Sequence, residues 1–295
     1  SGKKDKEFEM KVGVIGAGAW GTALAITAAR GGADVLLWSY DGGVKEFEGV
    51  ACPENINVTT QMSDLSAADV WLVVTPAAYF RDTVRAARPF YKGVPVIICT
   101  KGAECSTGDF MSEVLRAELP ECSDFGVLSG PQFAAEVARG VPTGSTLAGT
   151  QNARRIGADA LRRLYISESS DVIGAEMCGV GKNAVALICG YTSVVSGENE
   201  RAMIFTRAWG EVVNIGLALG SDVRTFLDLC GIGDLFLSAT SPTSRNFSAG
   251  MAIARGEEIV GTVEGIFALG GILRRARSLG LDTPILTMMR EKLKV

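Results

Sequence analysis

The first half of the chain alternates short apolar runs with longer amphipathic stretches. Because the runs are rich in Val, Ile and Leu and are flanked by Gly, Pro or Asp, they are typical of parallel strands covered on both faces. The runs are KVGVI, ADVLLW, DVWLVVT, VPVIICT, FGVLSG and STLAGT. Between them, helical periodicity predicts crossover helices over residues 21–30, 80–89 and 109–119. This series predicts an α/β fold with an open, doubly wound sheet of Rossmann type.

The pattern changes near Gly174, and from Glu176 onward apolar positions recur at helical spacing. The predicted helices cover residues 176–196, 198–219, 221–227, 244–255, 264–279 and 284–294. We therefore expect an N-terminal domain at residues 1–174, with a leader at residues 1–10, and an all-helical C-terminal domain at residues 175–295. No proline-rich linker separates them, which predicts that the two domains abut closely.

The composition of the chain excludes several kinds of functional site. A chain of 295 residues that is 47% hydrophobic and 21% charged can bury two cores. Its net charge is −4 and its basic residues are scattered, so nucleic acid is not an expected partner. The chain has no histidine, which excludes His-ligated metal sites and His-dependent hydrolysis, and no metal is expected. Proton transfer must then use Lys, Asp, Glu, Tyr or Cys.

The seven cysteines are odd in number, widely spaced and free of CxxC pairs, which is typical of reduced, buried thiols in a cytoplasmic protein. Residues 1–10 lack an apolar segment and do not form a signal peptide, and we interpret Ser1-Gly2 as a scar of processing. Residues 12–29 carry no charge and are long enough to span a bilayer. The glycines that interrupt this segment are explained better by a ligand-binding motif than by a membrane span, so no integral membrane segment is expected.

That explanation is the motif GAGAWG at residues 16–21, which follows a predicted strand and opens a predicted helix. In such a motif the first glycine (Gly16) permits a tight turn, the second (Gly18) lets backbone approach a pyrophosphate, and the third (Gly21) lets helix pack on strand. Free N–H groups at the helix start attract phosphates. The motif predicts a dinucleotide-binding domain, the alternative being a tight turn without a ligand.

The predicted second strand indicates which dinucleotide binds. Asp41 follows the glycines by roughly 20 residues, where NAD-binding folds place an acidic residue on the ribose. No arginine lies nearby to hold the 2′-phosphate of NADP. The sequence therefore favours NAD and leaves NADP open.

Lys182 is the only charged residue between Glu176 and Glu198. A helix that is apolar on nearly all faces is buried, and burial lowers the pKa of a lysine toward the range of acid–base catalysis. The alternative is a lysine that reaches out of a helix end to cap carbonyl groups.

Two further polar clusters follow in the sequence. Asp234 lies in a Gly-rich apolar segment where a carboxylate needs a partner, for which Lys182 is a candidate. Ser244, Arg245 and Asn246 open a predicted helix, and a hydroxyl, an Arg fork, an amide and helix N–H groups together suit a phosphate. The alternative for Ser244 is an ordinary helix N-cap.

Seven blocks of the sequence resemble the NAD(P)-dependent glycerol-3-phosphate dehydrogenases, in that family's order. They are GAGAWGTALA, TKG at 100–102, LSGPQFAAEVARGVPT from 128, GKNAVALICG from 181, GIGDL from 231, SRN at 244–246 and VEG at 263–265. The resemblance implies an oxidoreductase of glycerophospholipid metabolism that interconverts dihydroxyacetone phosphate, a phosphorylated triose, and sn-glycerol 3-phosphate with NAD or NADP. It also implies a cytoplasmic homodimer with its active site in the cleft between the two domains.

The same resemblance implies a role for individual residues. Lys182 corresponds to the catalytic acid/base lysine, Lys101 to a lysine that reaches substrate and cofactor, and Asp234 to an acidic residue of the same site. The expected substrate-binding residues are Lys101, Gly130, Gln132, Lys182, Asp234, Ser244, Arg245 and Asn246. The expected cofactor-binding residues, including Asp41 from its position, are Gly16, Gly18, Ala19, Trp20, Gly21, Asp41, Lys101, Ala134, Arg245 and Glu264.

The chain also departs from the family pattern. Gln132 stands where Ser is usual, Ser39-Tyr40 where bacterial members commonly have a basic residue, and residues 41–62 form a shorter segment. Two alternatives stay open: a related dehydrogenase of a hydroxy acid or a sugar acid, and a non-catalytic dinucleotide-binding sensor. The SRN cluster disfavours the first because a carboxylate substrate does not require it, and intact Lys101, Lys182 and Asp234 disfavour the second.

Overall fold

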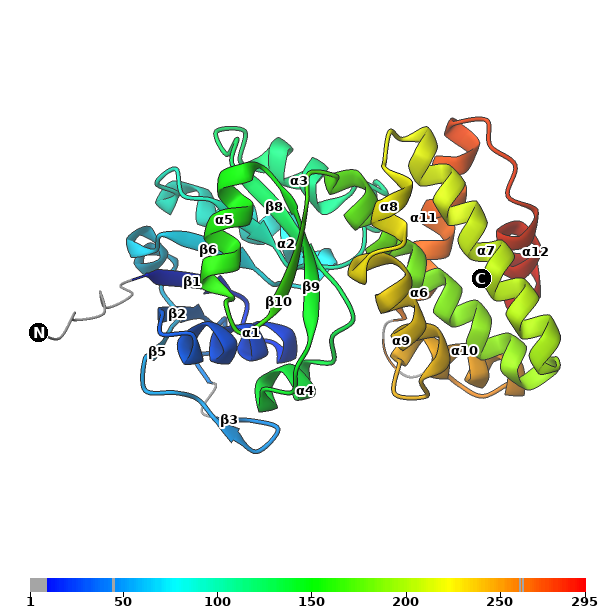
Figure 1. The fold of residues 1–295 in the computed structure, drawn as a ribbon, viewed down its shortest axis with the longest axis horizontal. Coiled ribbons are helices and arrows are strands. Elements are labelled where there is room, and N and C mark those ends of the chain that lie inside the picture. Colours follow the sequence, from blue (N-terminus) through cyan, green and yellow to red (C-terminus); the bar gives the residue numbers. More distant parts are fainter. Residues whose placement is uncertain (1–9, 44–45, 260, 262) are drawn as a thin grey trace, which may run out of the picture. The chain divides into compact units, whose positions relative to one another are not determined.

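The computed structural model describes residues 10–43, 46–259, 261 and 263–295 (Figure 1). Ser1-Gly2, interpreted above as a scar of processing, and all but one residue of the predicted leader lie outside the described residues. The chain forms two compact units. Unit 1 comprises residues 1–100, 112–128 and 132–170, and unit 2 comprises residues 101–111, 129–131 and 171–295. The assignment of separate roles to residues 1–174 and 175–295 stays a prediction.

Unit 1 is built on a sheet of eight strands in the order β10-β9-β8-β7-β6-β1-β2-β5. The strands from β5 to β8 pair in parallel, as do β9 and β10 with each other. Their bounds are β1 Lys11–Ile15, β2 Asp34–Trp38, β5 Ile56–Thr59, β6 Val70–Val73, β7 Val96–Ile98, β8 Phe125–Ser129, β9 Gly144–Gly149 and β10 Tyr165–Ser169. A small hairpin, β3 Glu46–Phe47 and β4 Val50–Ala51, lies outside this sheet.

All six predicted strands are present, and the α/β prediction is confirmed. The two strands of the main sheet that were not predicted, β5 and β10, lie at its edges. Their sequences, INVT and YISES, are partly exposed and contain polar residues. Edge strands are covered less completely than central ones, so they lack the continuous apolar run on which the prediction relied.

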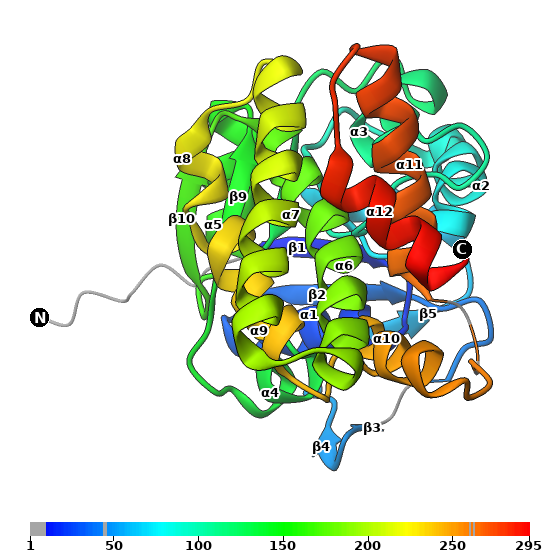
Figure 2. The same cartoon turned by 90° about the vertical axis from the view of Figure 1, so that its right-hand side faces the viewer.

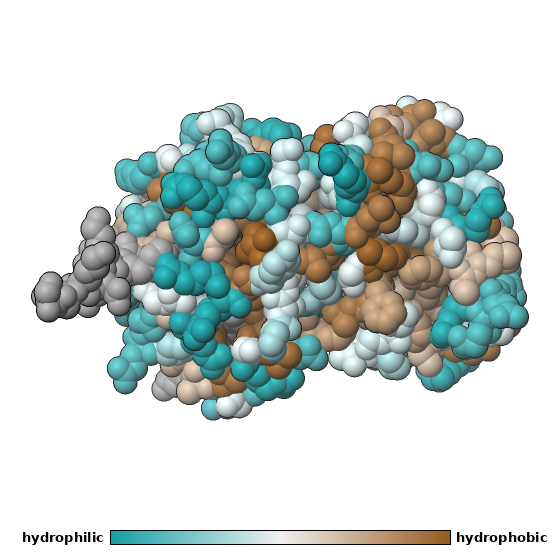
Figure 3. Space-filling view, viewed as in Figure 1, coloured by the Kyte–Doolittle hydropathy of each residue, from teal (hydrophilic) through white to brown (hydrophobic). Residues whose placement is uncertain are grey.

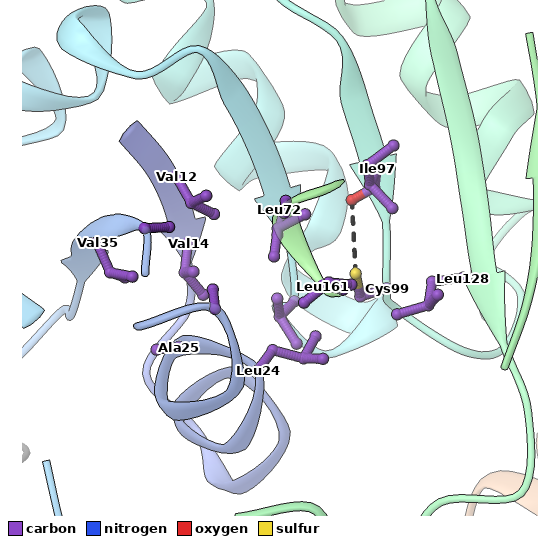
Figure 4. Packing of buried hydrophobic residues seen from close by; sticks show 14 of the residues in the cluster. Val12, Val14, Leu24, Ala25, Val35, Leu72, Ile97, Cys99, Leu128 and Leu161 are labelled. Carbon is purple, nitrogen blue, oxygen red and sulfur yellow. Dashed lines mark hydrogen bonds between the residues drawn. The ribbon is translucent and has the colours of Figure 1, made fainter. Parts of the chain in front are cut away.

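Helices cover both faces of the sheet of unit 1. On one face, α1 (Ala19–Arg30), α4 (Ala134–Arg139) and α5 (Gln151–Ala160) contribute to a common apolar core with side chains of the strands. Figure 4 shows Val12 and Val14 of β1 beside Leu24 and Ala25 of α1. On the other face, α2 (Ala77–Ala87) and α3 (Met111–Glu118) pack near Trp71. Short 3₁₀ helices, η1 Met62–Ala67 and η2 Arg88–Phe90, complete the connections.

Unit 2 is helical around one central helix, α6 (Val172–Val195), which contacts α7, α9, α10 and α11 (Figure 2). The other helices are α7 Glu198–Ala218, α8 Val223–Phe226, a π-helical turn Leu229–Gly233, α9 Asp234–Thr240, α10 Arg245–Arg255, α11 Glu264–Ser278 and α12 Pro284–Leu293. All six helices predicted from Glu176 onward are present, whereas the π-helical turn and α9 were not predicted. Glycines at 231 and 233 conceal the helical periodicity there.

Among the described helices, α6 is the one that is long and apolar enough to cross a membrane, judged by length and composition alone. Its most apolar stretch is 89% buried within the protein, so α6 is a core helix. Five of the seven cysteines are buried, as predicted, whereas Cys52 is half-buried and Cys105 is exposed.

The backbones of α6 and α10 touch directly. A Cβ added at Gly190 of α6 would lie 1.9 Å from the carbonyl oxygen of Phe247, and one at Gly250 of α10 would lie 2.0 Å from that of Leu187. Real Cβ atoms do not approach backbone so closely, so both positions require glycine. This close approach brings the start of α10, at Asn246, beside Asn183 in the middle of α6.

Candidate active site

The glycine-rich loop of unit 1 connects β1 to α1. Gly16 has φ +116°, a conformation that favours glycine, and Gly21 lies so close to it that an added Cβ would be 1.8 Å from the carbonyl oxygen of Gly16. At Gly18, by contrast, an added Cβ would meet no described atom within 4 Å. The three glycines therefore provide a tight turn, an open approach and a close helix-on-strand contact, as their spacing predicted.

The start of α1 fits the phosphates of a dinucleotide. Gly18 is its N-cap, no described side chain caps the helix, and the first turn contains no acidic residue. The unpaired N–H groups of Ala19, Trp20 and their neighbours can therefore donate to an anion. Within the described part of the chain, the indole Nε1 of Trp20 is buried without a hydrogen-bond partner, which leaves a further donor for a ligand.

The end of β2 lies beside this loop, because the Gly16 N–H donates to the carbonyl oxygen of Trp38 at 3.1 Å. Asp41 follows β2 and is exposed. The Ser39 hydroxyl donates to Asp41 Oδ1 at 2.7 Å, and the Gly42 N–H donates to Ser39 Oγ at 3.2 Å. The bond from Ser39 lowers the pKa of Asp41, so a carboxylate is held at this position.

Two other predicted residues of unit 1 lie just after β8, Gln132 in the loop that leads to α4 and Ala134 at the start of that helix. Gln132 has both amide atoms buried without a hydrogen-bond partner among the described residues. An unsatisfied buried amide is costly and calls for an explanation, and a ligand that bonds to it would supply one. Ala134 is the first residue of α4, which packs against α1.

Unit 2 contains a buried cluster of charges centred on Asp234, whose side chain is 1% exposed. Lys182 Nζ donates to Asp234 Oδ1 at 2.8 Å, and Lys101 Nζ donates to Asp234 Oδ2 at 2.7 Å. One carboxylate thus binds two ammonium groups. The backbone places Asp234 between the two ammonium groups, because Asp234 begins α9 directly after the π-helical turn. That turn needs Gly231, where an added Cβ would lie 2.2 Å from the carbonyl oxygen of Phe226.

Further hydrogen bonds fix both lysines. Lys182 Nζ donates to Ser238 Oγ at 3.1 Å, and Ser238 Oγ donates to Asp234 Oδ1 at 3.3 Å. Lys101 Nζ donates to the carbonyl oxygen of Gly130 at 2.8 Å, which brings that predicted residue into the cluster. Ser238 was not predicted. The sequence feature that could have indicated Ser238 is its spacing of four residues from Asp234, which places both side chains on one face of α9.

Burial and charge set the protonation of the cluster. Burial lowers the pKa of Lys182 to about 8, against the attraction of Asp234, which raises it. Burial alone would raise the pKa of Asp234, but the ammonium groups of Lys101 and Lys182 outweigh it and hold this pKa below its ordinary value. A pKa of about 8 allows Lys182 to gain or lose a proton near neutral pH.

The SRN residues lie at the start of α10. Ser244 is its N-cap and accepts from the N–H of Phe247 at 3.4 Å, so the N-cap interpretation is confirmed. The Arg245 side chain is 83% exposed and lies 3.7 Å from Glu264 Oε1. Asn246 is buried, and its Nδ2 donates to Asn183 Oδ1 at 2.9 Å.

The predicted residues of unit 2 thus form two groups. Lys101, Gly130, Lys182 and Asp234 lie in the charged cluster. Ser244, Arg245, Asn246 and Glu264 lie at the starts of α10 and α11. Asn183 joins the groups, because it follows Lys182 on α6 and its Nδ2 donates to Glu264 Oε2 at 3.1 Å. Asn183 was not among the predicted site residues.

Comparison with known proteins identifies relatives over nearly the whole chain. Residues 11–155 match the family model of the NAD-dependent glycerol-3-phosphate dehydrogenase N-terminus, and residues 171–294 match that of its C-terminus. The glycerol-3-phosphate dehydrogenase [NAD(P)+] of Parvibaculum lavamentivorans is 38% identical over 93% of this chain and 89% of its own. That of Maricaulis maris is 38% identical over 95% of this chain and 91% of its own.

A solved structure shows the same similarity. The crystal structure of glycerol-3-phosphate dehydrogenase from Coxiella burnetii superimposes with a TM-score of 0.87 and 28% sequence identity, covering 97% of this chain and 95% of the other.

We expect Lys182 to titrate at a pH of about 8, because burial disfavours its charged form and lowers its pKa. Carbon-13 NMR of Cε-labelled lysines measures this directly, and the resonance is assigned by its loss in Lys182→Met. In Asp234→Asn the pKa of Lys182 should fall further, because the attraction of the Asp234 carboxylate is lost while the repulsion from Lys101 stays. A Lys182 resonance that titrates near the ordinary lysine pKa of 10.5 would contradict the electrostatics described above.

Proposed function

Because this chain belongs to the NAD-dependent glycerol-3-phosphate dehydrogenase family, we propose that Lys182, Asp234 and Lys101 form its catalytic centre. The protein is an oxidoreductase that interconverts dihydroxyacetone phosphate and sn-glycerol 3-phosphate, with NAD(P) as its coenzyme. The observation that carries the assignment of roles is the buried Lys182, which has a lowered pKa and is held on a carboxylate that a second lysine shares.

The hydrogen bonds of Lys182 suit it to transfer a proton. An ammonium group has three N–H donors, and Asp234 and Ser238 accept two of those of Lys182. The third is available for the oxygen of the substrate carbonyl. When bound, NAD(P)H supplies the hydride that adds to the carbonyl carbon. In reduction Lys182 donates its proton to that oxygen, and in the reverse direction its neutral amine removes the proton of the hydroxyl group.

Lys101 adds to the same effect. It too uses two donors within the cluster, on Asp234 and on Gly130, which leaves one for the substrate. Two ammonium groups and one carboxylate give the cluster one net positive charge. This charge stabilises the negative charge that develops on the substrate oxygen during reduction, and Asp234 keeps both ammonium groups in place beforehand.

We assign the substrate phosphate to the start of α10. Its helix N–H groups, the Asn246 amide and the Ser244 hydroxyl lie at one place, and the exposed Arg245 side chain can reach an anion there. Binding energy from the phosphate, which does not react, orients the carbonyl toward Lys182. Gly130 and Gln132 complete the proposed set of substrate-binding residues.

For the coenzyme we propose the glycine-rich loop with Ala19 and Trp20, together with Asp41, Lys101, Ala134, Arg245 and Glu264. The pyrophosphate would lie at Gly18, where the backbone is open, and Asp41 would accept hydrogen bonds from the ribose hydroxyls. Residues 38–43 contain no Lys or Arg, so a 2′-phosphate would meet a carboxylate and no counter-charge. We therefore propose that this enzyme prefers NAD to NADP.

We also propose that the enzyme is a homodimer of the cytoplasm, with nucleotide binding in residues 1–174 and substrate binding and catalysis in residues 175–295. Supporting a dimer, apolar side chains are exposed around α8 and α9, among them Leu227 at 67% and Phe236 at 66%. Figure 3 shows this apolar surface in brown. A second copy of the chain would cover it, and light scattering of the purified enzyme measures the mass directly.

Steady-state kinetics test the catalytic assignment. We expect turnover of dihydroxyacetone phosphate with NADH, slow turnover of unphosphorylated dihydroxyacetone, and a fall in kcat of about 10²–10⁴-fold in Lys182→Ala because the general acid is lost. For reduction, activity should decline as pH rises through about 8, since the ammonium is the donor, and for oxidation it should rise over the same range. A kcat of Lys182→Ala within a few-fold of the wild-type value would contradict the role of this lysine.

Arg245→Ala tests the phosphate assignment in the same assay. Loss of a charge-assisted hydrogen bond should raise KM for dihydroxyacetone phosphate about tenfold or more, and at saturating NADH it should leave the rate with unphosphorylated dihydroxyacetone nearly unchanged. An equal effect on both substrates would show that Arg245 does not bind the phosphate.

Nucleotide preference is tested by binding rather than by turnover. The wild type should bind NADH at least about tenfold more tightly than NADPH, measured by calorimetry with the substrate omitted. Asp41→Asn should narrow this ratio because it removes the negative charge near the 2′ position without changing the size of the side chain. Asp34→Asn, which removes an exposed carboxylate at the opposite end of β2, is the matched control. Equal narrowing in both variants would assign the preference to net charge and not to Asp41.

A further inference from the structure

A closed ring of hydrogen bonds joins α6, α10 and α11 beside the charged cluster. Asn183 Nδ2 donates to Glu264 Oε2 at 3.1 Å, and Asn246 Nδ2 donates to Asn183 Oδ1 at 2.9 Å. The backbone N–H of Gly265 donates to Asn246 Oδ1 at 2.8 Å. Because Gly265 follows Glu264 in the chain, these three bonds and the Glu264 residue itself close the ring.

The ring has only one consistent direction. The Gly265 N–H can only donate, so the atom of Asn246 that faces it must be the oxygen, and Asn246 must present its NH₂ group to Asn183. Asn183 in turn must accept with its oxygen, which leaves its own NH₂ group for the Glu264 carboxylate. A single backbone donor thus fixes the orientation of both amides and the position of one carboxylate oxygen.

Packing makes the ring rigid. Asn183 is 3% exposed and Asn246 is 8% exposed. At Gly265 an added Cβ would lie 2.6 Å from the carbonyl oxygen of Asn183 and 3.0 Å from Asn246 Oδ1, so any larger residue would open the ring. The glycine contacts between α6 and α10 fix the distance between these two helices, and so between Asn183 and Asn246.

We propose that Asn183 is a positioning residue for the reaction, which fixes Asn246 and Glu264 with respect to Lys182. The inference rests on the proposed function, in which Asn246 binds the substrate phosphate and Glu264 the coenzyme. Asn183 is the residue next to Lys182 on α6, so its two bonds tie the phosphate site and the coenzyme site to the backbone that carries the proton donor. It also holds Glu264 Oε2, while the other oxygen, Oε1, lies 3.7 Å from Arg245.

The chemistry of the ring provides a rescue experiment. In Asn183→Asp the residue still accepts from Asn246, but it meets the Glu264 carboxylate with a second carboxylate, and this bond of the ring breaks. Adding Glu264→Gln supplies an NH₂ group at position 264 that donates to the new carboxylate at position 183. In the wild type the donor and acceptor of this bond are the other way round. The double variant therefore closes the ring again with the same net charge as the wild type, moved from one residue to the other.

We expect Asn183→Asp to lower kcat by about a hundredfold and to raise KM for both dihydroxyacetone phosphate and NADH, because small displacements of positioned groups cost rates of this size. The double variant should return to within a few-fold of Glu264→Gln alone. Thr192→Val, which removes a buried side-chain hydrogen bond elsewhere in α6, is the matched control and should leave kcat and both KM values unchanged. No recovery in the double variant, or unchanged constants in Asn183→Asp, would overturn the proposal.

A second readout needs neither coenzyme nor turnover. Hydrogen exchange of the Gly265 amide, followed by NMR in the enzyme without nucleotide, should be slow in the wild type. It should be at least about tenfold faster in Asn183→Asp, because repulsion of Glu264 moves the adjoining Gly265 away from Asn246 Oδ1, and slow again in the double variant. Exchange unaffected by Asn183→Asp would overturn the proposal, because the ring would not depend on this residue. If Asn183→Asp does not fold, Asn183→Ala is compared with Thr192→Val by the same measurements.

The two readouts separate this proposal from the function on which it rests. A wild type that does not turn over dihydroxyacetone phosphate refutes the proposed function, while the Gly265 exchange series still reports whether Asn183 holds the ring. A wild type that does turn over, combined with an opened ring and unchanged kinetic constants, refutes the positioning role alone.

Discussion

The central constraint on unit 2 is the burial of Asp234, a carboxylate that is 1% exposed and touches two ammonium groups. An isolated charge at such a depth would be very costly, and partners are required on both of its oxygens. Lys182 satisfies one oxygen and Lys101 the other. Removing either lysine would leave the carboxylate with incomplete compensation, so the three side chains function as one electrostatic unit.

This requirement explains several features of the surrounding backbone. The π-helical turn ends directly before Asp234, the residue that must enter the core, and its glycine at 231 allows the chain to touch the carbonyl group of Phe226. The segment that carries Lys101 belongs to unit 2, although it follows a strand of unit 1 in the sequence. Stability and chemistry are linked here, because the burial that makes the pairing necessary also lowers the pKa of Lys182, while Asp234 limits that decrease.

The sequence predicts the central strands, most of the helices and the charged pair, for physical reasons, but not the helices α4, α5 and α9. A buried central strand is a run of apolar residues, and a lysine alone in an apolar helix requires a partner, which Asp234 provides. The edge strands β5 and β10 escaped prediction because they are partly polar. The ring through Asn183 could not be found in this way, because it depends on which residues of three helices meet. A single asparagine in an apolar segment does not show which residues of the neighbouring helices it will contact.

The positions of Lys182 and Asn183 as neighbours on α6 have a consequence for how the chain tolerates changes in length. Successive residues of a helix point about 100° apart, so the two side chains serve different partners from one turn of backbone. Insertion of one residue between Gly174 and Lys182 would rotate both away from their partners on α9, α10 and α11 at once. An insertion near Gly43, in an exposed segment of unit 1, would disturb neither. Variation in length is therefore confined to loops, while α6 must keep its residue count.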